Sequence, residues 1–182
     1  MWPQRPREEI AETLGVAEAV KHLRKTTEDV SIPLIKELHK IVFRKSKEFA
    51  GRFRKKGEEV SVVDPQGNIV HRGAPSTLVV PLLRRLAKWY AGNNDSLQPL
   101  VLAAVVHNQF ETIHPFRDGN GRVGRLLLIN ILLKHGLPPV NIDLRNRGQY
   151  YHALKEYQSN GDIRPTIELL LKEYRGLRGI VG

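Results

Sequence analysis

The stretch HPFRDGNGRVGR, residues 114–125, concentrates residue types that can carry chemistry. The imidazole of His114 changes protonation near neutral pH and can take a proton from a hydroxyl group. The carboxylate of Asp118 is a hard oxygen ligand of the kind that Mg²⁺ takes beside the phosphates of a nucleotide. Each feature taken alone also occurs in ordinary turns and helix ends. Their combination within twelve residues is what predicts a site.

Gly119, Asn120 and Gly121 open the helix that follows, and glycine lets a backbone turn sharply and approach a ligand closely. Unpaired amides at a helix N-terminus and the positive end of the helix dipole together bind anions. Arg122 and Arg125 are three residues apart and lie on nearly the same side of this helix. Arginines at that end are disfavoured unless an anion is present, so the sequence predicts a bound diphosphate or triphosphate.

Two helices must hold this loop, one over residues 97–112 and one over residues 121–135. They are the most apolar stretches of the chain, and a helix that is apolar around most of its circumference is normally central in a fold. Phe116 alternates with polar neighbours in the loop between them. We expect its ring to pack into the core as an anchor, so that His114 and Asp118 point the other way.

Periodicity predicts further helices, because apolar residues recur three and four positions apart along much of the chain. These helices cover residues 16–25, 31–44, 75–91, 146–159 and 164–175. Residues 58–73 differ, since two β-branched runs flank DPQGN and predict a β-hairpin. A lone hairpin is marginal in water, so it either packs on the helices or receives a strand from a partner.

The composition is that of a globular protein, with 41% hydrophobic and 26% charged residues in 182 positions, which predicts a single domain. No apolar run approaches the roughly 20 residues that cross a bilayer, and the N-terminus lacks the apolar core of a signal peptide. We therefore expect a cytoplasmic protein with no membrane partner. The absence of cysteine excludes disulfides and thiolate metal sites. The net charge of +10 indicates either a polyanionic partner or a solvated basic surface.

Residues 114–125 resemble the signature of the Fic family, H-x-F-x-D/E-G-N-G-R-x-x-R, and every fixed position is present. Residues 51–54 (GRFR) and 147–154 (RGQYYHAL) are similar to other parts of Fic domains, and the resemblance covers residues 16–177. It implies an all-α, Fic-type helical domain in which two central helices flank the signature loop and one β-hairpin forms a flap. We accordingly expect a single Fic-like domain over residues 16–182 and an N-terminal extension or linker over residues 1–15.

The resemblance also implies an activity, the transfer of AMP from ATP to a Ser, Thr or Tyr hydroxyl of a target protein, with release of pyrophosphate. His114 would be the base and Asp118 would hold Mg²⁺. The phosphates would be bound by Gly119, Asn120, Gly121, Arg122 and Arg125. Phe116 would be the structural anchor of the loop.

The same resemblance assigns a role to the hairpin, the flap that aligns the target segment as an added strand. Its target-docking residues would be Val60, Ser61, Val62 and His71. Tyr150 and Tyr151 match the aromatic pair near the adenine, and Tyr151 is the favoured contact. A tyrosine pair on a helix can equally place one ring in the core and one in solvent.

One departure concerns inhibition. Many Fic proteins carry a helix S/T-x-x-x-E-G/N whose glutamate pairs with the second signature arginine, here Arg125. No Glu-Gly or Glu-Asn pair occurs in this chain. Either a separate antitoxin-like protein inhibits it, or an upstream inhibitory helix is missing, or it is unregulated. Residues 8–25 resemble the linker after such a helix, which favours a shortened chain. The absence of the inhibitory glutamate also argues against a second activity, the removal of AMP from a modified protein, because that reaction uses this glutamate in the family.

Three alternatives remain open at this point. Relatives transfer UMP, a phosphoryl group or phosphocholine, but Gly119 and Gly121 favour AMP. Basic clusters at residues 52–56, 84–85 and 145–147 would suit a nucleic-acid module with a vestigial site, although no nucleic-acid motif is present and we do not expect this as the main role. His107 and Glu111 share a helical face, but a metallohydrolase would need a third ligand at metal-site spacing, and His107 is expected in the core.

Overall fold

A computed structural model of the chain describes residues 7–26, 28–63, 66–140, 142, 145 and 147–178. Its helices are α1 (Arg7–Leu23), α2 (Ile32–Phe43), the 3₁₀ turn η1 (Ser76–Leu78), α3 (Val79–Asn93), α4 (Pro99–Ile113), α5 (Asn120–Lys134), α6 (Arg147–Asn160) and α7 (Arg164–Arg178). The strands are β1 (Ser61–Val63) and β2 (Ile69–Arg72). The expected all-α architecture with one hairpin is confirmed. None of the helices within these ranges is long and apolar enough to span a membrane.

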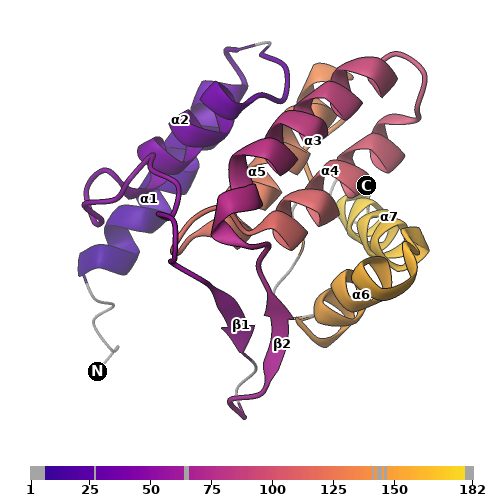
Figure 1. Cartoon of the computed structure of the whole chain (residues 1–182). Coiled ribbons are helices and arrows are strands. Elements are labelled where there is room, and N and C mark those ends of the chain that lie inside the picture. The colour runs from indigo at the N-terminus through magenta and orange to yellow at the C-terminus, as the bar shows by residue number, and fades with distance from the viewer. Residues whose placement is uncertain are drawn as a thin grey trace, which may run out of the picture.

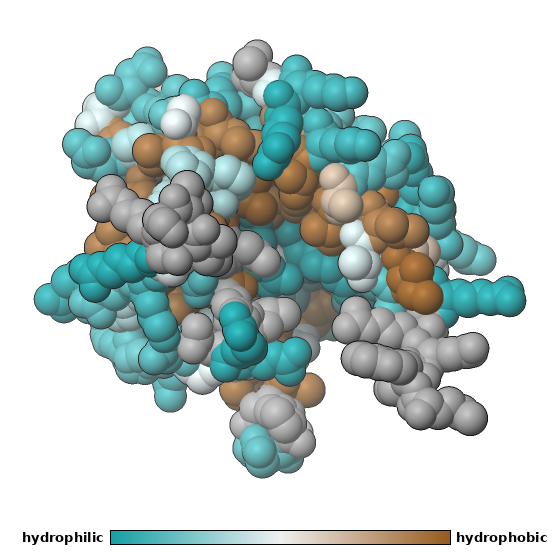
Figure 2. Space-filling view, turned by 180° about the vertical axis from the view of Figure 1, so that it is seen from behind, coloured by the Kyte–Doolittle hydropathy of each residue, from teal (hydrophilic) through white to brown (hydrophobic). Residues whose placement is uncertain are grey.

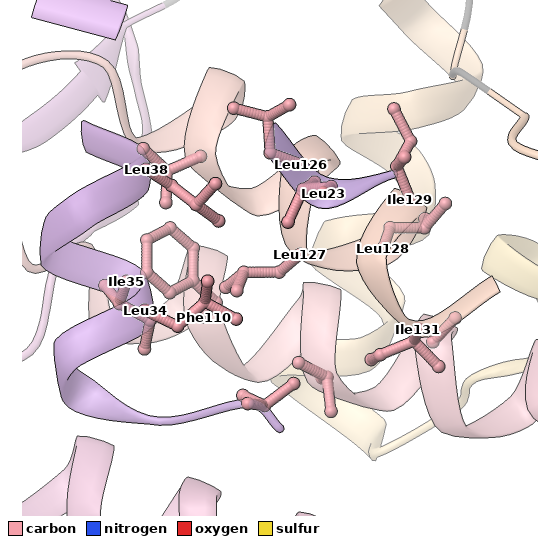
Figure 3. Packing of buried hydrophobic residues seen from close by; sticks show 14 of the residues in the cluster. Leu23, Leu34, Ile35, Leu38, Phe110, Leu126, Leu127, Leu128, Ile129 and Ile131 are labelled. Carbon is pink, nitrogen blue, oxygen red and sulfur yellow. The ribbon is translucent and has the colours of Figure 1, made fainter. Parts of the chain in front are cut away.

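The centre of the molecule is the helix pair α4 and α5 (Figure 1). Both helices bury residues around most of their circumference, as their apolar sequences predict. Figure 3 shows how Phe110 of α4 lies among Leu34 and Ile35 of α2 and Leu127 of α5. The loop that joins α4 to α5 is therefore held at both ends by the most buried part of the fold.

Helices α1 and α2 pack side by side on one flank of this pair (Figure 1). Ser31 caps α2, since its Oγ accepts a hydrogen bond of 3.3 Å from the amide of Leu34. A methyl group added at Gly15 of α1 would overlap the carbonyl oxygen of Val42. The absence of a side chain at Gly15 thus lets α1 approach α2 closely and reach α5.

The first helix begins earlier than the sequence predicts. α1 starts at Arg7 rather than at residue 16, so the expected boundary between an extension and the domain falls inside a helix. Only residues 1–6 of the expected extension lie outside the described residues.

Helices α6 and α7 cover the other flank (Figure 1). Inside this contact, the amide nitrogen Nδ2 of Asn108 on α4 donates a hydrogen bond of 2.9 Å to Thr166 on α7. α6 lies next to β2, and Nδ1 of His71 on β2 donates to the amide oxygen of Gln158 on α6 over 3.0 Å. This arrangement leaves a space between the hairpin, α6 and the start of α5.

The hairpin is antiparallel, with Ser61 paired to Arg72 and Val62 paired to His71. Its strands are shorter than the predicted segment of residues 58–73, and residues 64 and 65 at its tip lie outside the described ranges. Val63 and Ile69 are exposed, 54% and 48% of their surface. In Figure 2 hydrophobic surface is visible on the projection at the bottom of the molecule, where the hairpin lies. In the hairpin, β2 packs on α6.

Candidate active site

The loop of residues 114–119, between α4 and α5, has an unusual backbone. His114 has a φ of 52°, and it is the one residue other than glycine with a positive φ in the described part of the chain. Such a conformation costs energy and concentrates at functional sites. Gly119 has a φ of 82°, and a methyl group added there would overlap the ring of Phe43. Glycine is therefore required at the turn into α5 for both conformation and space.

Phe116 lies in the core with 0% of its surface exposed, as expected of an anchor. Its ring stacks on His39 of α2 with 3.8 Å between the ring centroids. The side chain of Asn120 binds both backbone groups of Phe116, accepting from N at 2.8 Å and donating to O at 2.9 Å. Asn120 thus fixes the loop with its side chain, so only its backbone amide could contribute to phosphate binding.

Arg54 ties the loop to the ends of the hairpin from a position that is 4% exposed. Its guanidinium donates to the carbonyl oxygens of His114 at 2.9 Å and of Ile113 at 3.3 Å. It also donates to the carbonyl oxygens of Glu58 and Ala74, which flank the strands. The sequence placed Arg54 in the resemblance of residues 51–54 and in the basic cluster of residues 52–56, but it did not indicate this structural role, because the partners of Arg54 are backbone oxygens.

The imidazole of His114 is oriented by the backbone of α4. Its Nδ1 lies 3.2 Å from the carbonyl oxygen of Glu111, and because a carbonyl can only accept, Nδ1 carries the proton. The lone pair is then on Nε2. Burial lowers the pKa of His114 to about 4, helped by the nearby His71 and Arg54. At neutral pH the ring is uncharged, the form that can accept a proton.

A cavity of about 310 Å³ opens beside His114, within the size range of small-ligand sites. Its lining is Val62, Val70 and His71 of the hairpin, Glu111 and His114, Gly121 and Arg125 of α5, and Arg147, Tyr150, Tyr151, Leu154, Lys155 and Gln158 of α6. Seven of the predicted site residues meet here: His114, Gly121, Arg125, Tyr150, Tyr151, Val62 and His71.

Arg125 lies at the helix start that the sequence predicts as an anion site. An ideal Cβ on Gly121 would be 3.3 Å from Nη1 of Arg125, so the guanidinium lies against the first turn of α5. The amides of Asn120 and Gly121 belong to the first residues of α5, which have no acceptor within their own helix. Arg125 makes no ion pair with any residue in the described ranges. Its charge is therefore available to a ligand.

Arg122 occupies a different environment from Arg125. Its Nη1 donates to the carboxylate of Glu12, a buried residue of α1. Its guanidinium lies 4.6 Å from the ring centroid of Phe43. Arg122 does not line the cavity, so it can serve a phosphate only if Glu12 releases it.

The remaining predicted residues lie around the cavity rather than in its lining. Asp118 is exposed, and its Oδ1 accepts a hydrogen bond of 2.6 Å from the amide of Gly119. Gly119 itself packs on Phe43. Val60 precedes β1, where its carbonyl oxygen accepts from Gly73 at 3.0 Å, and Ser61 begins the strand.

Several lining residues were not singled out from the sequence as site residues: Val70, Glu111, Arg147, Leu154, Lys155 and Gln158. Those on α6 lie three, four or seven positions from Tyr151, so they share one helical face. The helical spacing of these residues relative to Tyr151 is a signal in the sequence that could have identified them. Glu111 appeared only in the metallohydrolase alternative.

Asp118 is the carboxylate that could bind a magnesium ion at this site. Asp118 is exposed close to the first turn of α5, as a ligand shared with nucleotide phosphates should be. No group of three or more His, Cys, Asp or Glu residues that could hold a metal is found over the described ranges. The residues thus fit an ion whose other ligands are phosphates and water.

Comparison with known proteins identifies the family of this chain. The Fic/DOC family model matches residues 29–132. The Drosophila melanogaster protein named Protein adenylyltransferase Fic is 35% identical over 168 residues, and the match covers 90% of this chain but 32% of that protein. The chain thus spans about a third of the length of this relative.

Solved structures share the fold. A Fic family protein from Desulfovibrio desulfuricans superposes with a TM-score of 0.80 at 29% identity, over 97% of this chain and 55% of that one. BepC of Bartonella tribocorum, with bound AMPPNP, superposes with a TM-score of 0.69 at 20% identity, over 92% of this chain and 86% of that one. The chain belongs to the Fic/DOC family.

Proposed function

We propose that this chain is a protein adenylyltransferase, which moves AMP from ATP to a hydroxyl side chain of a target protein or of itself. The observation that carries the proposal is the position of His114, an uncharged imidazole whose Nε2 is free to accept a proton, beside a cavity lined by Gly121 and Arg125. The name of the Drosophila relative supports the same activity.

ATP would bind with its adenosine between the hairpin and α6, where Tyr151 and Leu154 offer apolar surface. Its phosphates would bind the free amides at the start of α5 and the guanidinium of Arg125. Arg122 would join them only after leaving Glu12. The related BepC structure contains AMPPNP, which supports a nucleotide site in this fold.

The transfer step then follows from the position of His114. The target oxygen attacks the α-phosphorus, its proton moves to Nε2 of His114, and the bond to the β-phosphate breaks to release pyrophosphate. Arg125 stabilises the charge on the departing phosphates. Mg²⁺ held by Asp118 would neutralise part of the phosphate charge.

The target would dock on the hairpin as an added strand, because β1 and β2 form a sheet of two strands whose Val62, Val70 and His71 line the cavity. Arg125 makes no ion pair with an acidic residue in the part of the chain that the structure describes. Inhibition would therefore come from a separate antitoxin-like protein or from an inhibitory helix that this sequence does not contain, or the chain is unregulated.

ATP labelled at the α or at the γ position tests the reaction type. Incubation with a cell lysate should label protein from the α position and not from the γ position. His114→Ala should abolish the label, whereas His152→Ala, an exposed histidine outside the cavity on α6, should retain it. Label from the γ position alone would indicate phosphoryl transfer and would contradict the proposal.

A further inference from the structure

Glu111 is a carboxylic acid in a position where proteins rarely place one. It lies on α4 one helical turn before His114, with 5% of its surface exposed, and it lines the cavity. Its Oε1 is buried without a hydrogen-bond partner among the described residues. A buried carboxylate without a partner is costly, so a contribution to stability does not explain a glutamate at this position.

The neighbouring helix is shaped to accommodate this side chain. A methyl group added at Gly124 of α5 would overlap Oε1 of Glu111 and would lie 3.3 Å from its Cδ. Glycine inside a helix costs about 1 kcal/mol relative to alanine. The position of the carboxyl group is thus built into the contact between α4 and α5.

The carboxyl group faces the protonated side of the catalytic ring. Oε2 of Glu111 lies 3.9 Å from Nδ1 of His114, whose proton already points toward the backbone oxygen of the same glutamate. The ring atom that would accept the substrate proton, Nε2, is on the opposite side. An anion at Glu111 can therefore act on His114 without occupying the place of the target hydroxyl.

Other groups near Glu111 come from each element packed around it. Arg125 of α5 is the nearby permanent cation, and it favours the ionised carboxylate. His107 of α4 is uncharged at neutral pH because burial lowers its pKa to about 4, and its Nε2 lies 3.1 Å from the hydroxyl of Tyr150 on α6. His71 of β2 lies close both to the ring of His114, with 5.7 Å between the two ring centroids, and to the backbone of Glu111.

We propose that Glu111 is a positioning residue for His114. The carboxylate of Glu111 favours the ring form of His114 protonated at Nδ1 and stabilises the imidazolium that forms during transfer. The inference rests on the proposed function. When the hydroxyl proton reaches Nε2, the ring carries a positive charge that burial disfavours. A negative charge 3.9 Å away in a site shielded from water offsets that cost far more than it would in solvent.

Burial raises the pKa of Glu111 to about 7, while Arg125 opposes this effect. The carboxylate is therefore present above about pH 7 and is lost as the pH falls below it. If the charge assists His114, the rate of transfer should rise through this pH range in the wild-type chain.

The test compares Glu111→Gln, Glu111→Asp and Glu37→Gln, the last being an exposed glutamate of α2 that undergoes the same chemical change. Gln keeps the shape and can still form hydrogen bonds, but it has no charge. At pH 8 we expect Glu111→Gln to lower kcat by about ten-fold or more, with little change in KM for ATP. The transfer rate of Glu111→Gln should no longer rise with pH, whereas the rate of Glu111→Asp should still rise in part.

Glu37→Gln should behave as the wild type. A Glu111→Gln variant that keeps both kcat and the rise with pH would overturn the proposal. So would a variant that loses ATP affinity and kcat together while the pH dependence persists, since that result would assign Glu111 to nucleotide binding.

A second measurement requires no transfer and so separates this inference from the proposed function. The ¹⁵N signals of the His114 ring at pH 8 report which nitrogen carries the proton. We expect the form protonated at Nδ1 to dominate in the wild type and to lose population in Glu111→Gln. Equal populations in both would contradict the positioning role, whereas a wild type without transfer would contradict the adenylyltransferase assignment.

Discussion

Nε2 of His39 on α2 lies 3.1 Å from the backbone oxygen of Asp118 in the loop that precedes α5. Nδ1 of the same ring accepts a hydrogen bond of 2.8 Å from the amide of Gly51, so Nε2 carries the proton and donates it to Asp118. The ring also stacks on Phe116. The side chain of His39 thus holds the loop at both Phe116 and Asp118.

Replacing His39 by Phe should show what this contact contributes. The substitution keeps a ring against Phe116 but leaves the amide of Gly51 and the oxygen of Asp118 without a partner. Each buried group left unpaired costs about 1–3 kcal/mol. We expect a lower free energy of unfolding in urea and a slower transfer at saturating ATP. Unchanged stability would mean that water replaces both hydrogen bonds.

Arg54→Met should lower the stability of the fold more than His39→Phe does. Met keeps much of the apolar length of Arg54 but removes the donors to the carbonyl oxygens of His114, Ile113, Glu58 and Ala74. Breaking a buried charged network costs on the order of 3–5 kcal/mol, so thermal unfolding should occur at a much lower temperature. Arg52→Met, at an exposed neighbouring arginine, is the matched control and should leave the transition in place.

Arg122 and Arg125, the two arginines at the start of α5, should differ in function. Arg125→Ala removes a free guanidinium from the cavity and should weaken ATP binding about ten-fold to a hundred-fold by calorimetry. Arg122→Ala makes the same charge change, but it removes the partner of Glu12 and should mainly lower stability. Equal losses of ATP affinity would show that Arg122 leaves Glu12 when the nucleotide binds.

Glu12→Gln provides a further test of this ion pair. Without the carboxylate, Arg122 is free to turn toward the phosphates, so ATP affinity should rise relative to the wild type. The gain should disappear in the double variant Glu12→Gln with Arg122→Ala. A gain that persists in the double variant would show that Glu12 acts on the site by another route.

Buried histidines should make the fold sensitive to acid. His107 is fully buried, and its pKa falls from 6.5 to about 4 on folding. Its contribution to stability is present above pH 6.5 and is lost as the pH falls toward 4, by at most about 1.4 kcal/mol per pH unit. Urea unfolding at pH 7 and pH 5 should therefore differ less in His107→Gln than in the wild type. An equal difference in both would assign the acid sensitivity to other groups.

Much of the fold could be predicted from the sequence because its central elements carry simple patterns. α4 and α5 are apolar around most of their circumference, and turn residues mark the hairpin. The start of α1 was missed because the buried face of its first half is made of Glu12 and Gly15 rather than of apolar side chains. Periodicity of hydrophobic residues cannot detect such a face.

The site was predicted in part for a similar reason. His114, Gly121 and Arg125 belong to one short motif and meet at the cavity. The pairing of Arg122 with Glu12 joins residues 110 positions apart, and the burial of Glu111 depends on the space left by Gly124. Contacts of this kind are set by how helices pack, which no local pattern records.

In the proposed reaction, Nε2 of His114 takes the proton of a hydroxyl group while AMP moves from ATP to the oxygen of that group. Peptide mass spectrometry of the chain and of lysate proteins, after incubation with ATP and Mg²⁺, would detect the product of this reaction. We expect AMP attached to Ser, Thr or Tyr side chains with the wild type and none with His114→Ala. Equal modification by both chains would contradict it.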